Sequence, residues 1–290
     1  MDIRELKYFL TVAHEGNFSR AAEQLHITQP ALSRQIMLLE DEIGVQLLER
    51  GKRHVTLTES GFLLAQRAKD ILDLIDKTER EFSEQKNFVG GTVCVGCVET
   101  IAASFLSECI VDYAANYPEV MFNVYTSYTD DIRGKLDLGV LDIGILTEPA
   151  EIAKYDFAYL PIVDEWGAIL ERTHPLARQS EIRPSDLLKE RLILPRRDVF
   201  QTEITSWLGK ERGKANVVAT HSLLTTSVLL VERGFGCAVG PKYSYEYCKS
   251  GKCVWLPFEP RKYLRHVMVW KKNTQLAPAV KKFIEMFAGM

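Results

Sequence analysis

The segment from Thr58 to about Lys86 restricts the possible folds more than any other part of the sequence. Thr58 suits a helix cap, and apolar side chains then recur at alternating steps of four and three residues. This heptad seam consists of Leu64, Ala68, Ile71, Ile75, Thr78 and Phe82. A helix this long, and polar elsewhere, cannot fold back on much of its own domain. We therefore expect a helix from a second subunit to cover the seam, with an intramolecular core stripe as the alternative.

The composition is typical of a globular protein with more than one domain. Of the 290 residues, 46% are hydrophobic and 26% are charged. Charged residues interrupt the apolar ones at the N-terminus, unlike in a signal peptide, and the sequence has no window of about 18 apolar residues. We therefore expect a cytoplasmic protein with no membrane partner.

Residues 3–39 contain three short helical patterns. Apolar side chains recur at helical spacing over residues 3–14, and a second pattern follows Asn17. The third begins where Thr28 suits an N-cap and Pro30 the first turn, and it continues to about Leu39. The sequence therefore predicts a helix-turn-helix over residues 18–39.

Two apolar runs beyond Gly44 predict a β-hairpin that would form the wing of a winged helix. The runs flank a short segment that carries Arg50, Lys52 and Arg53. A basic hairpin tip of this kind fits the DNA backbone or the adjacent minor groove.

A helix that reads DNA needs an exposed N-terminal end that reaches base edges and an opposite face that is packed. Gln29 offers an amide for adenine, and Arg34 offers a guanidinium for guanine or phosphate. The net charge of −3 gives no general attraction to DNA, so binding has to depend on a few placed groups. A three-helix packing module is the alternative. We assign DNA contacts to Ser19, Arg20, Thr28, Gln29, Pro30, Ala31, Ser33, Arg34, Arg50, Lys52 and Arg53.

Beyond a hinge at residues 87–91, strand-like and helical runs alternate, which indicates an α/β domain with a mostly parallel sheet. Strands are predicted at 93–98, 120–125, 143–146, 168–170, 192–194, 217–219, 237–239 and 267–270. Helices are predicted at 101–116, 131–138, 204–212, 223–232 and from about Ala277 onward.

The sequence shows no signature of an enzyme. It contains no nucleophile elbow, P-loop, dinucleotide fingerprint or paired metal-ligand spacing, and its six histidines have no ligand spacing. A solute-binding protein would need a secretion signal instead of the helix-turn-helix. Six cysteines are too few for a disulfide scaffold, and we expect idle thiols, although Cys248 and Cys253 flank a turn and could approach each other.

The N-terminal motifs resemble those of the LysR-type transcriptional regulators. The matching stretches are FLTVA at 9–13, NFSRAA at 17–22, TQPALS at 28–33, GVQLL at 44–48, Arg53 and LTESG at 57–61. Looser fragments of the same family follow at 117–120, 141–144 and 174–176. Leu48 replaces a phenylalanine that is common in the family, which is a conservative apolar change. The peroxide sensors of this family carry a reactive cysteine pair, and no segment here resembles theirs.

The resemblance implies a winged helix-turn-helix, a linker helix and a two-subdomain effector domain similar to periplasmic binding proteins. We place these domains at 1–58, 59–90 and 91–290, with crossovers near Pro161 and Arg265 that divide subdomain I (91–161 and 266–290) from subdomain II (162–265). The family implies a homodimer or homotetramer on imperfect inverted repeats of double-stranded DNA. RNA polymerase is a further expected partner. No cofactor is expected besides a small-molecule effector.

Ligands of open α/β sheets bind beyond the carboxyl ends of strands, where helices begin. In relatives the position of Thr100 contacts the effector, and a plain N-cap is the alternative. Arg196 suits a carboxylate or another anion, with a solvated loop arginine as the alternative, while Glu99 could instead accept an amine. The effector residues assigned in this way are Glu99, Thr100, Ile101, Thr126, Ser127, Tyr128, Thr147, Pro195, Arg196, His221 and Ser222.

Overall fold

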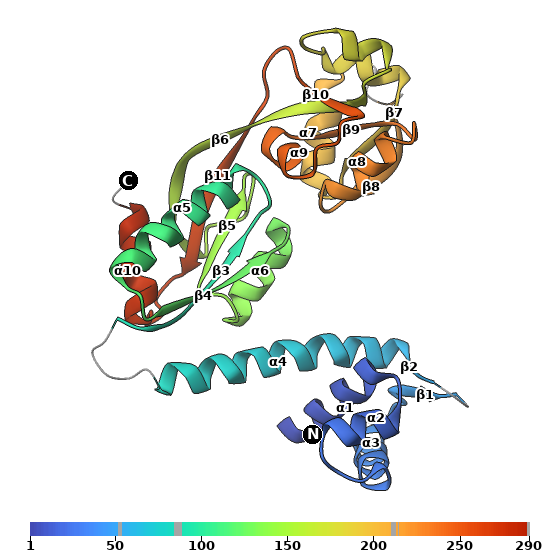
Figure 1. Ribbon diagram of the computed structural model, residues 1–290, viewed down its shortest axis with the longest axis vertical. Helices are drawn as coiled ribbons and strands as arrows, with labels where there is room; N and C mark the ends of the chain where they lie inside the picture. Colours follow the sequence, from blue (N-terminus) through green and yellow to red (C-terminus); the bar gives the residue numbers. More distant parts are fainter. Residues whose placement is uncertain (52–53, 84–88, 210–212, 214, 289–290) are drawn as a thin grey trace. The chain divides into compact units, whose positions relative to one another are not determined.

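The computed structural model describes residues 1–51, 54–83, 89–209, 213 and 215–288 (Figure 1). The chain divides into two compact units, Met1–Gln85 and Lys86–Met290. Each unit has hydrophobic clusters of its own, so the two are described separately below.

Three capped helices begin the N-terminal unit. They are α1 (Ile3–Glu15), α2 (Phe18–Gln24) and α3 (Gln29–Ile43). Asp2, Asn17 and Thr28 precede them, and each accepts a backbone N–H group from the first turn of its helix. An antiparallel hairpin of β1 (Leu48–Arg50) and β2 (Val55–Leu57) follows, as the sequence predicts, and then α4 (Glu59–Ser83).

The helix α3 continues one turn beyond the predicted end at Leu39. It ends at Ile43 because the first residue that breaks it is Gly44, which caps the helix in the left-handed conformation with φ of 79°. The added turn has a structural role, since the Glu40 carboxylate accepts the backbone N–H groups of Leu47 and Leu48 at 2.8 and 3.0 Å. These two bonds fix the start of the hairpin.

The seam of α4 is divided between two environments. Ala68 is fully buried and Leu64 is half-buried against the core of the same unit, so the intramolecular alternative holds for these two positions. Farther along, Ile71 is 38% exposed, whereas Ile75 is half-buried and Thr78 exposed. The side chain of Phe82 lies outside the described residues.

The C-terminal unit is built on a nine-stranded sheet within its described residues, in the order β4-β3-β5-β11-β6-β9-β7-β8, with β10 paired to β6. The strands are β3 (Gly91–Cys97), β4 (Val120–Thr126), β5 (Ile143–Thr147), β6 (Tyr155–Glu171), β7 (Arg191–Pro195), β8 (Asn216–His221), β9 (Cys237–Pro241), β10 (Cys253–Pro257) and β11 (Tyr263–Lys271). The sheet is mixed, because β6 and β11 run antiparallel to their neighbours, whereas β3 and β7 pair in parallel with theirs.

Helices cover both faces of this sheet (Figure 1). They are α5 (Ile101–Asn116), α6 (Thr129–Leu138), α7 (Asp198–Trp207), α8 (Thr225–Val231), α9 (Lys242–Cys248) and α10 (Pro278–Ala288), with short 3₁₀ helices at Pro175–Arg178 and Pro184–Lys189. The prediction placed α7 too late, at 204–212. The helix starts at Asp198, with two residues between it and the end of β7, and its buried residues are Phe200 and Ile204.

The unit has separate cores in its two halves, subdomain I and subdomain II. Leu160 and Val267 belong to the first core, whereas Trp166 and Leu264 belong to the second. The change therefore falls inside β6 and β11, the strands that also contain Pro161 and Arg265. Figure 1 shows these two strands as the connections between the halves. The sequence predicted only the last part of each strand, at 168–170 and 267–270.

Candidate functional site

The helix α3 has one buried face and one exposed face. Leu32, Ile36 and Leu39 are fully buried, and they hold the helix against α1 and α2. On the other face Gln29, Pro30, Ala31 and Arg34 are exposed, and Ser33 is half-buried. Thr28 is exposed at the cap, where its hydroxyl accepts the N–H group of Ala31 at 3.4 Å. The exposed end of the helix is the arrangement that base reading in a major groove requires.

The remaining residues assigned to DNA lie around α3. Ser19 is exposed on α2, whereas the guanidinium of Arg20 is turned to Glu15, with Nε 3.7 Å from the carboxylate. The Arg20 side chain is nevertheless 62% exposed, so solvent or a phosphate can reach it. Of the wing cations, Lys52 and Arg53 and the side chain of Arg50 lie outside the described residues.

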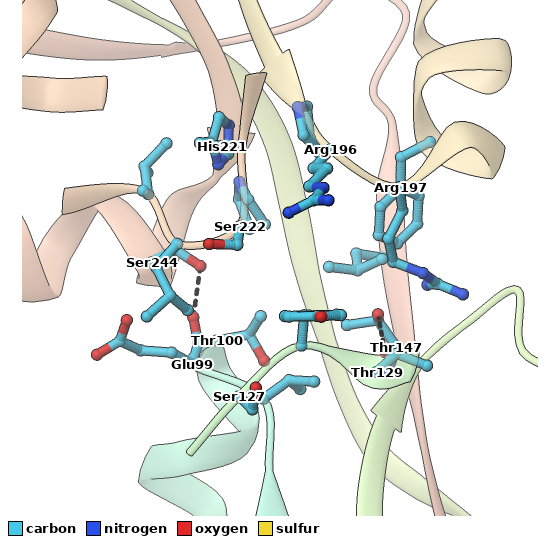
Figure 2. Close-up of a pocket in the computed structure, with 18 of the residues that line it drawn as sticks. Glu99, Thr100, Ser127, Thr129, Thr147, Arg196, Arg197, His221, Ser222 and Ser244 are labelled. Atoms are coloured by element: carbon cyan, nitrogen blue, oxygen red, sulfur yellow. Dashed lines mark hydrogen bonds between the residues drawn. The ribbon is translucent and has the colours of Figure 1, made fainter. Parts of the chain in front are cut away.

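The C-terminal unit contains a cavity of about 470 Å³ with walls from both subdomains (Figure 2). Nine of the eleven residues assigned to the effector line it, namely Glu99, Thr100, Ser127, Tyr128, Thr147, Pro195, Arg196, His221 and Ser222. The other two do not. Ile101 begins α5 and donates its N–H group to Asp164, and Thr126 is exposed at the end of β4.

The apolar part of the cavity wall was not predicted from the sequence. Trp166, Phe200 and Leu264 come from β6, α7 and β11, which the sequence placed wrongly or incompletely. The Trp166 and Phe200 rings pack edge to face with centroids 5.2 Å apart. The polar residues that were missed are Thr129, Asp130, Arg197, Asp198 and Ser244.

The two consecutive arginines of the cavity have different environments. Arg197 is 13% exposed, and it donates from Nε to Asp130 at 3.0 Å and from Nη2 to the Pro149 carbonyl at 3.0 Å. Arg196 is exposed, and in Figure 2 its guanidinium points into the space between the two walls. Arg196 is therefore the more exposed of the two cations that line the cavity.

Two histidines stand at the cavity wall or just behind it, His221 half-buried and His266 fully buried. Burial lowers the pKa of His221 and of His266 to about 4, so both rings are neutral at pH 7. His221 lines the cavity and contacts the Val239 carbonyl through Nε2 at 3.3 Å. His266 is fully buried, with Nε2 2.7 Å from the hydroxyl of Thr100.

A buried carboxyl group joins the two subdomains near the same place. Asp164 is 1% exposed on β6, and burial raises its pKa. One of its oxygens accepts the N–H group of Ile101 at 3.2 Å, and the other accepts that of Tyr243 at 3.2 Å. Asp164 thereby caps α5 of subdomain I and α9 of subdomain II together.

Among the described residues, one group has the proximity that a metal site needs: His174, Glu190 and Cys237. His174 accepts the N–H group of Leu176 through Nδ1 at 3.2 Å, so Nε2 carries the hydrogen, 3.3 Å from the Glu190 carboxylate. The two side chains therefore contact each other directly.

Comparisons with known proteins decide between the functions that this geometry allows. Residues 3–62 match the model of the bacterial regulatory helix-turn-helix protein of the lysR family, and residues 86–290 match the LysR substrate binding domain. The chain belongs to the LysR family. It is a LysR-type DNA-binding transcriptional regulator with an effector-binding domain, and the family comprises regulators of transcription rather than enzymes.

One relative of this LysR-type regulator covers nearly its whole length, and another covers two thirds of it. It is 29% identical to the Hca operon transcriptional activator HcaR of Escherichia coli K12, over 98% of this chain and 96% of HcaR. It is 33% identical to the hydrogen peroxide-inducible genes activator of Pectobacterium carotovorum, over 67% of this chain and 64% of that protein. The crystal structure of CbnR, a LysR family regulator, has the same fold, with a TM-score of 0.75 and 23% identity over 98% of this chain and 97% of CbnR.

Five of the six cysteines of this LysR-type regulator lack the environment of activated thiols. All six lie within the described residues and are free. Burial raises the pKa of Cys97 and Cys237 to about 12, and that of Cys109, Cys248 and Cys253 to about 11. These five thiols stay protonated at pH 7, and the thiolate is the reactive form.

Within the part of the chain that the structure describes, no helix is both long enough and apolar enough to cross a bilayer.

Proposed function

We propose that this LysR-type regulator binds an operator as a homodimer through α3 and senses a small anionic effector in the cavity between its subdomains. The observation that carries the proposal is the convergence of nine separately assigned residues on one cavity around Arg196. Strands and helices far apart in sequence supply these residues, so the cavity exists only in the folded unit.

An anion suits the cavity for a physical reason. The Arg196 guanidinium projects between the walls, whereas Asp130 already pairs with Arg197. A carboxylate can accept two parallel hydrogen bonds from Arg196, and neighbouring hydroxyls can satisfy its remaining lone pairs. Walls from both subdomains let the ligand bias their relative orientation, which is the requirement for a change in DNA affinity.

The exposed apolar residues of α4 support a homodimer. Phe62 is 65% exposed, Leu63 58%, Ile71 38% and Leu74 40%. A partner helix from a second copy would remove this surface from water, together with Ile75 and Phe82 farther along the seam. A two-fold dimer presents two copies of α3 to an inverted repeat. We further propose that two such dimers form a tetramer and that RNA polymerase is a partner at the promoter.

Calorimetry with a panel of small carboxylates tests the sensing part of this proposal. We expect Arg196→Ala to weaken a bound carboxylate about 10- to 100-fold, the equivalent of about 1.5–3 kcal/mol for a hydrogen bond to a charged group. Arg178→Ala, an exposed arginine outside the cavity, is the matched control. Equal affinities in the two variants would contradict an anion at Arg196.

Sedimentation tests the dimer. We expect Leu74→Asp to shift the regulator toward monomers, because a charge in an apolar interface is left without a partner. Asp76→Asn, an exposed position on the same helix, is the control and is expected to leave the dimer intact. A monomeric wild-type chain would contradict the proposal.

A further inference from the structure

The two walls of the cavity carry different kinds of side chain. Among the described residues that line it, subdomain I supplies mainly hydroxyl groups and acidic side chains, and no cation. Subdomain II supplies both guanidinium groups and several large apolar side chains, among them Trp166, Phe200 and Leu264. An anion that binds Arg196 is therefore held by the same subdomain that supplies the apolar surface.

The apolar wall is fixed in place before any ligand arrives. Trp166, Phe200 and Leu264 belong to the same hydrophobic core, and all three are buried. The two rings pack edge to face, with their centroids 5.2 Å apart. Such a wall stabilises a ligand only where apolar atoms cover it, because hydrophobic association depends on the apolar area that is removed from water. A ligand with a hydrocarbon body therefore gains most from this side of the cavity.

Several hydroxyl groups of the opposite wall already have a partner within the protein. The hydroxyl oxygens of Thr129 and Thr147 are 2.8 Å apart and share a hydrogen bond, and the Thr100 hydroxyl lies 2.7 Å from Nε2 of His266. This second contact is a hydrogen bond in either tautomer of the ring, because a hydroxyl can both donate and accept. A hydroxyl with a protein partner can face apolar ligand atoms without leaving a buried polar group unpaired.

The serines of the cavity leave room for a few polar contacts. Ser244 donates to the backbone carbonyl of Glu99 at 2.7 Å. Ser127 and Ser222 also line the cavity, and each can offer its hydroxyl to the anion or to a water molecule. These neutral groups can support one carboxylate, but they cannot balance the charge of a second.

The charges of the wall favour a ligand with a single negative charge. Two guanidinium groups and three carboxylates line the cavity, and the charge of Arg197 is balanced by Asp130 at 3.0 Å. The Nη1 atom of Arg197 has no partner, but it is buried, so a ligand in the cavity does not reach it. Arg196 is the more exposed cation, whereas Glu99 and Asp198 are two further carboxylates. A second carboxylate on the ligand would therefore meet more negative than positive charge.

The cavity is also larger than a carboxylate group needs. Its volume of about 470 Å³ lies within the usual range of about 300–1,000 Å³ for pockets that enclose a small organic ligand. An acid that occupied only the surroundings of Arg196 would leave water against Trp166 and Phe200. Ordered water needs polar partners, and these rings offer few.

We propose that the effector is a hydrophobic monocarboxylic acid. Its carboxylate binds Arg196, and its hydrocarbon body packs on Trp166, Phe200 and Leu264 of the same subdomain. The threonine hydroxyls of subdomain I face the other side of this body. This inference rests on the proposed anion-sensing function, and it adds the chemical class of the ligand.

Two series of acids test the inference on the full-length regulator by calorimetry. The first consists of straight-chain, branched and aromatic monocarboxylates of increasing size. We expect the affinity to rise about two- to fourfold for each added methylene group until the cavity is full. The second compares each longer acid with the dicarboxylate of the same chain length. We expect the dicarboxylate to bind about 10-fold more weakly or worse, because its second charge has no partner.

The outcomes of the two series separate the inference from the proposed function. An affinity that does not depend on chain length would overturn the inference while leaving anion sensing intact, and so would dicarboxylates that bind as tightly as monocarboxylates. No binding by any of the acids would overturn both.

A variant of the aromatic wall locates the apolar contact. In Phe200→Leu, the long acids are expected to bind severalfold more weakly, whereas the shortest acids keep their affinity because their contact with Arg196 remains. Phe157→Leu makes the same change at an exposed position outside the cavity and is the matched control. An equal loss for short and long acids in Phe200→Leu, or no loss for either, would contradict packing of the ligand body on this ring.

A variant of the acidic side chains tests the exclusion of a second charge. The double variant Glu99→Gln, Asp198→Asn should bring the affinity of dicarboxylates severalfold closer to that of monocarboxylates, because it removes two negative charges from the wall. Glu259→Gln removes a negative charge from an exposed position outside the cavity and is the control. An unchanged ratio of the two affinities in the double variant would contradict the role of these carboxylates.

Discussion

The proposed DNA-reading surface and the proposed effector cavity are built in opposite ways. The exposed residues of α3 lie within one continuous stretch, and the buried residues between them hold that helix in place. The cavity instead takes residues from between Val98 and Leu264, on strands and helices of both subdomains. A reading surface on a capped, packed helix needs only local order to be correct. The cavity needs the whole C-terminal unit, including residues behind its wall such as the buried His266.

The largest expected effect tests whether the two units are energetically separate. Phe9 and Phe283 are both 0% exposed, one in each unit. Each replacement by alanine should destabilise its own unit by about 3–5 kcal/mol through lost burial and a new cavity. Urea unfolding followed by hydrogen exchange should show each loss in one unit only. Equal losses in both units from either variant would mean that the units unfold as one.

A second prediction uses pH, which should act on the C-terminal unit through His221 and His266. Their pKa values of about 4 lie below the ordinary value of 6.5, so the unfolded chain binds protons that the folded unit does not. Stability is then full above pH 6.5 and falls as the pH drops toward 4, by about 2 kcal/mol per histidine at pH 5. The raised pKa of Asp164 acts in the opposite direction.

Urea unfolding of the C-terminal unit at pH 7, 6 and 5 measures this loss. His221→Gln should remove about half of the histidine contribution, because glutamine does not titrate in this range. If the free energy of unfolding falls with pH as steeply in His221→Gln as in the wild type, groups other than this histidine cause the loss of stability.

Much of the N-terminal unit follows from local sequence, and this explains which predictions held. Thr28 and Pro30 mark the start of α3, and the apolar spacing fixes its buried face. The same reasoning failed for β6. Buried and exposed side chains do not simply alternate over residues 155–167, because the strand has different neighbours in each subdomain. The predicted end of α3 at Leu39 was wrong, because Glu40 and its acidic neighbours are polar but still helical.

The candidate cavity was predicted in part for the same reason. Residues at strand ends, such as Thr100 and Arg196, can be found from the α/β pattern alone. Trp166 and Ser244 lie on elements that the sequence did not reveal, and His266 contacts Thr100 from behind the wall. Contacts between residues 166 positions apart in the chain have no local signal.

A third prediction concerns the reading surface. Arg34→Ala should weaken specific operator binding by about 1–3 kcal/mol if the guanidinium contacts a base. Arg178→Ala removes the same charge from an exposed site in the C-terminal unit, and it controls for net charge. Fluorescence anisotropy at fixed salt compares the two variants. Equal operator affinities for wild type and Arg34→Ala would mean that another surface reads the DNA.

The smallest expected effect concerns the link between the subdomains. Arg197 of subdomain II and Asp130 of subdomain I form an ion pair at 3.0 Å, with Asp130 46% exposed. A double-mutant cycle with Arg197→Met and Asp130→Asn should give a coupling of about 1 kcal/mol or less, since the pair is partly exposed. Chemical unfolding of the C-terminal unit gives the coupling. A much larger value would mean that the pair holds the cavity closed.

Footprinting on the DNA upstream of its own gene tests the central claim most directly, using the organic acid that binds most tightly in calorimetry. The account predicts protection of two half-sites related by two-fold symmetry, a pattern that changes when the acid is added. The acid should have no effect on the pattern of Arg196→Ala, and Arg34→Ala should lose protection. Protection that the acid leaves unchanged in the wild type, or that responds equally in Arg196→Ala, would contradict an effector sensed in this cavity.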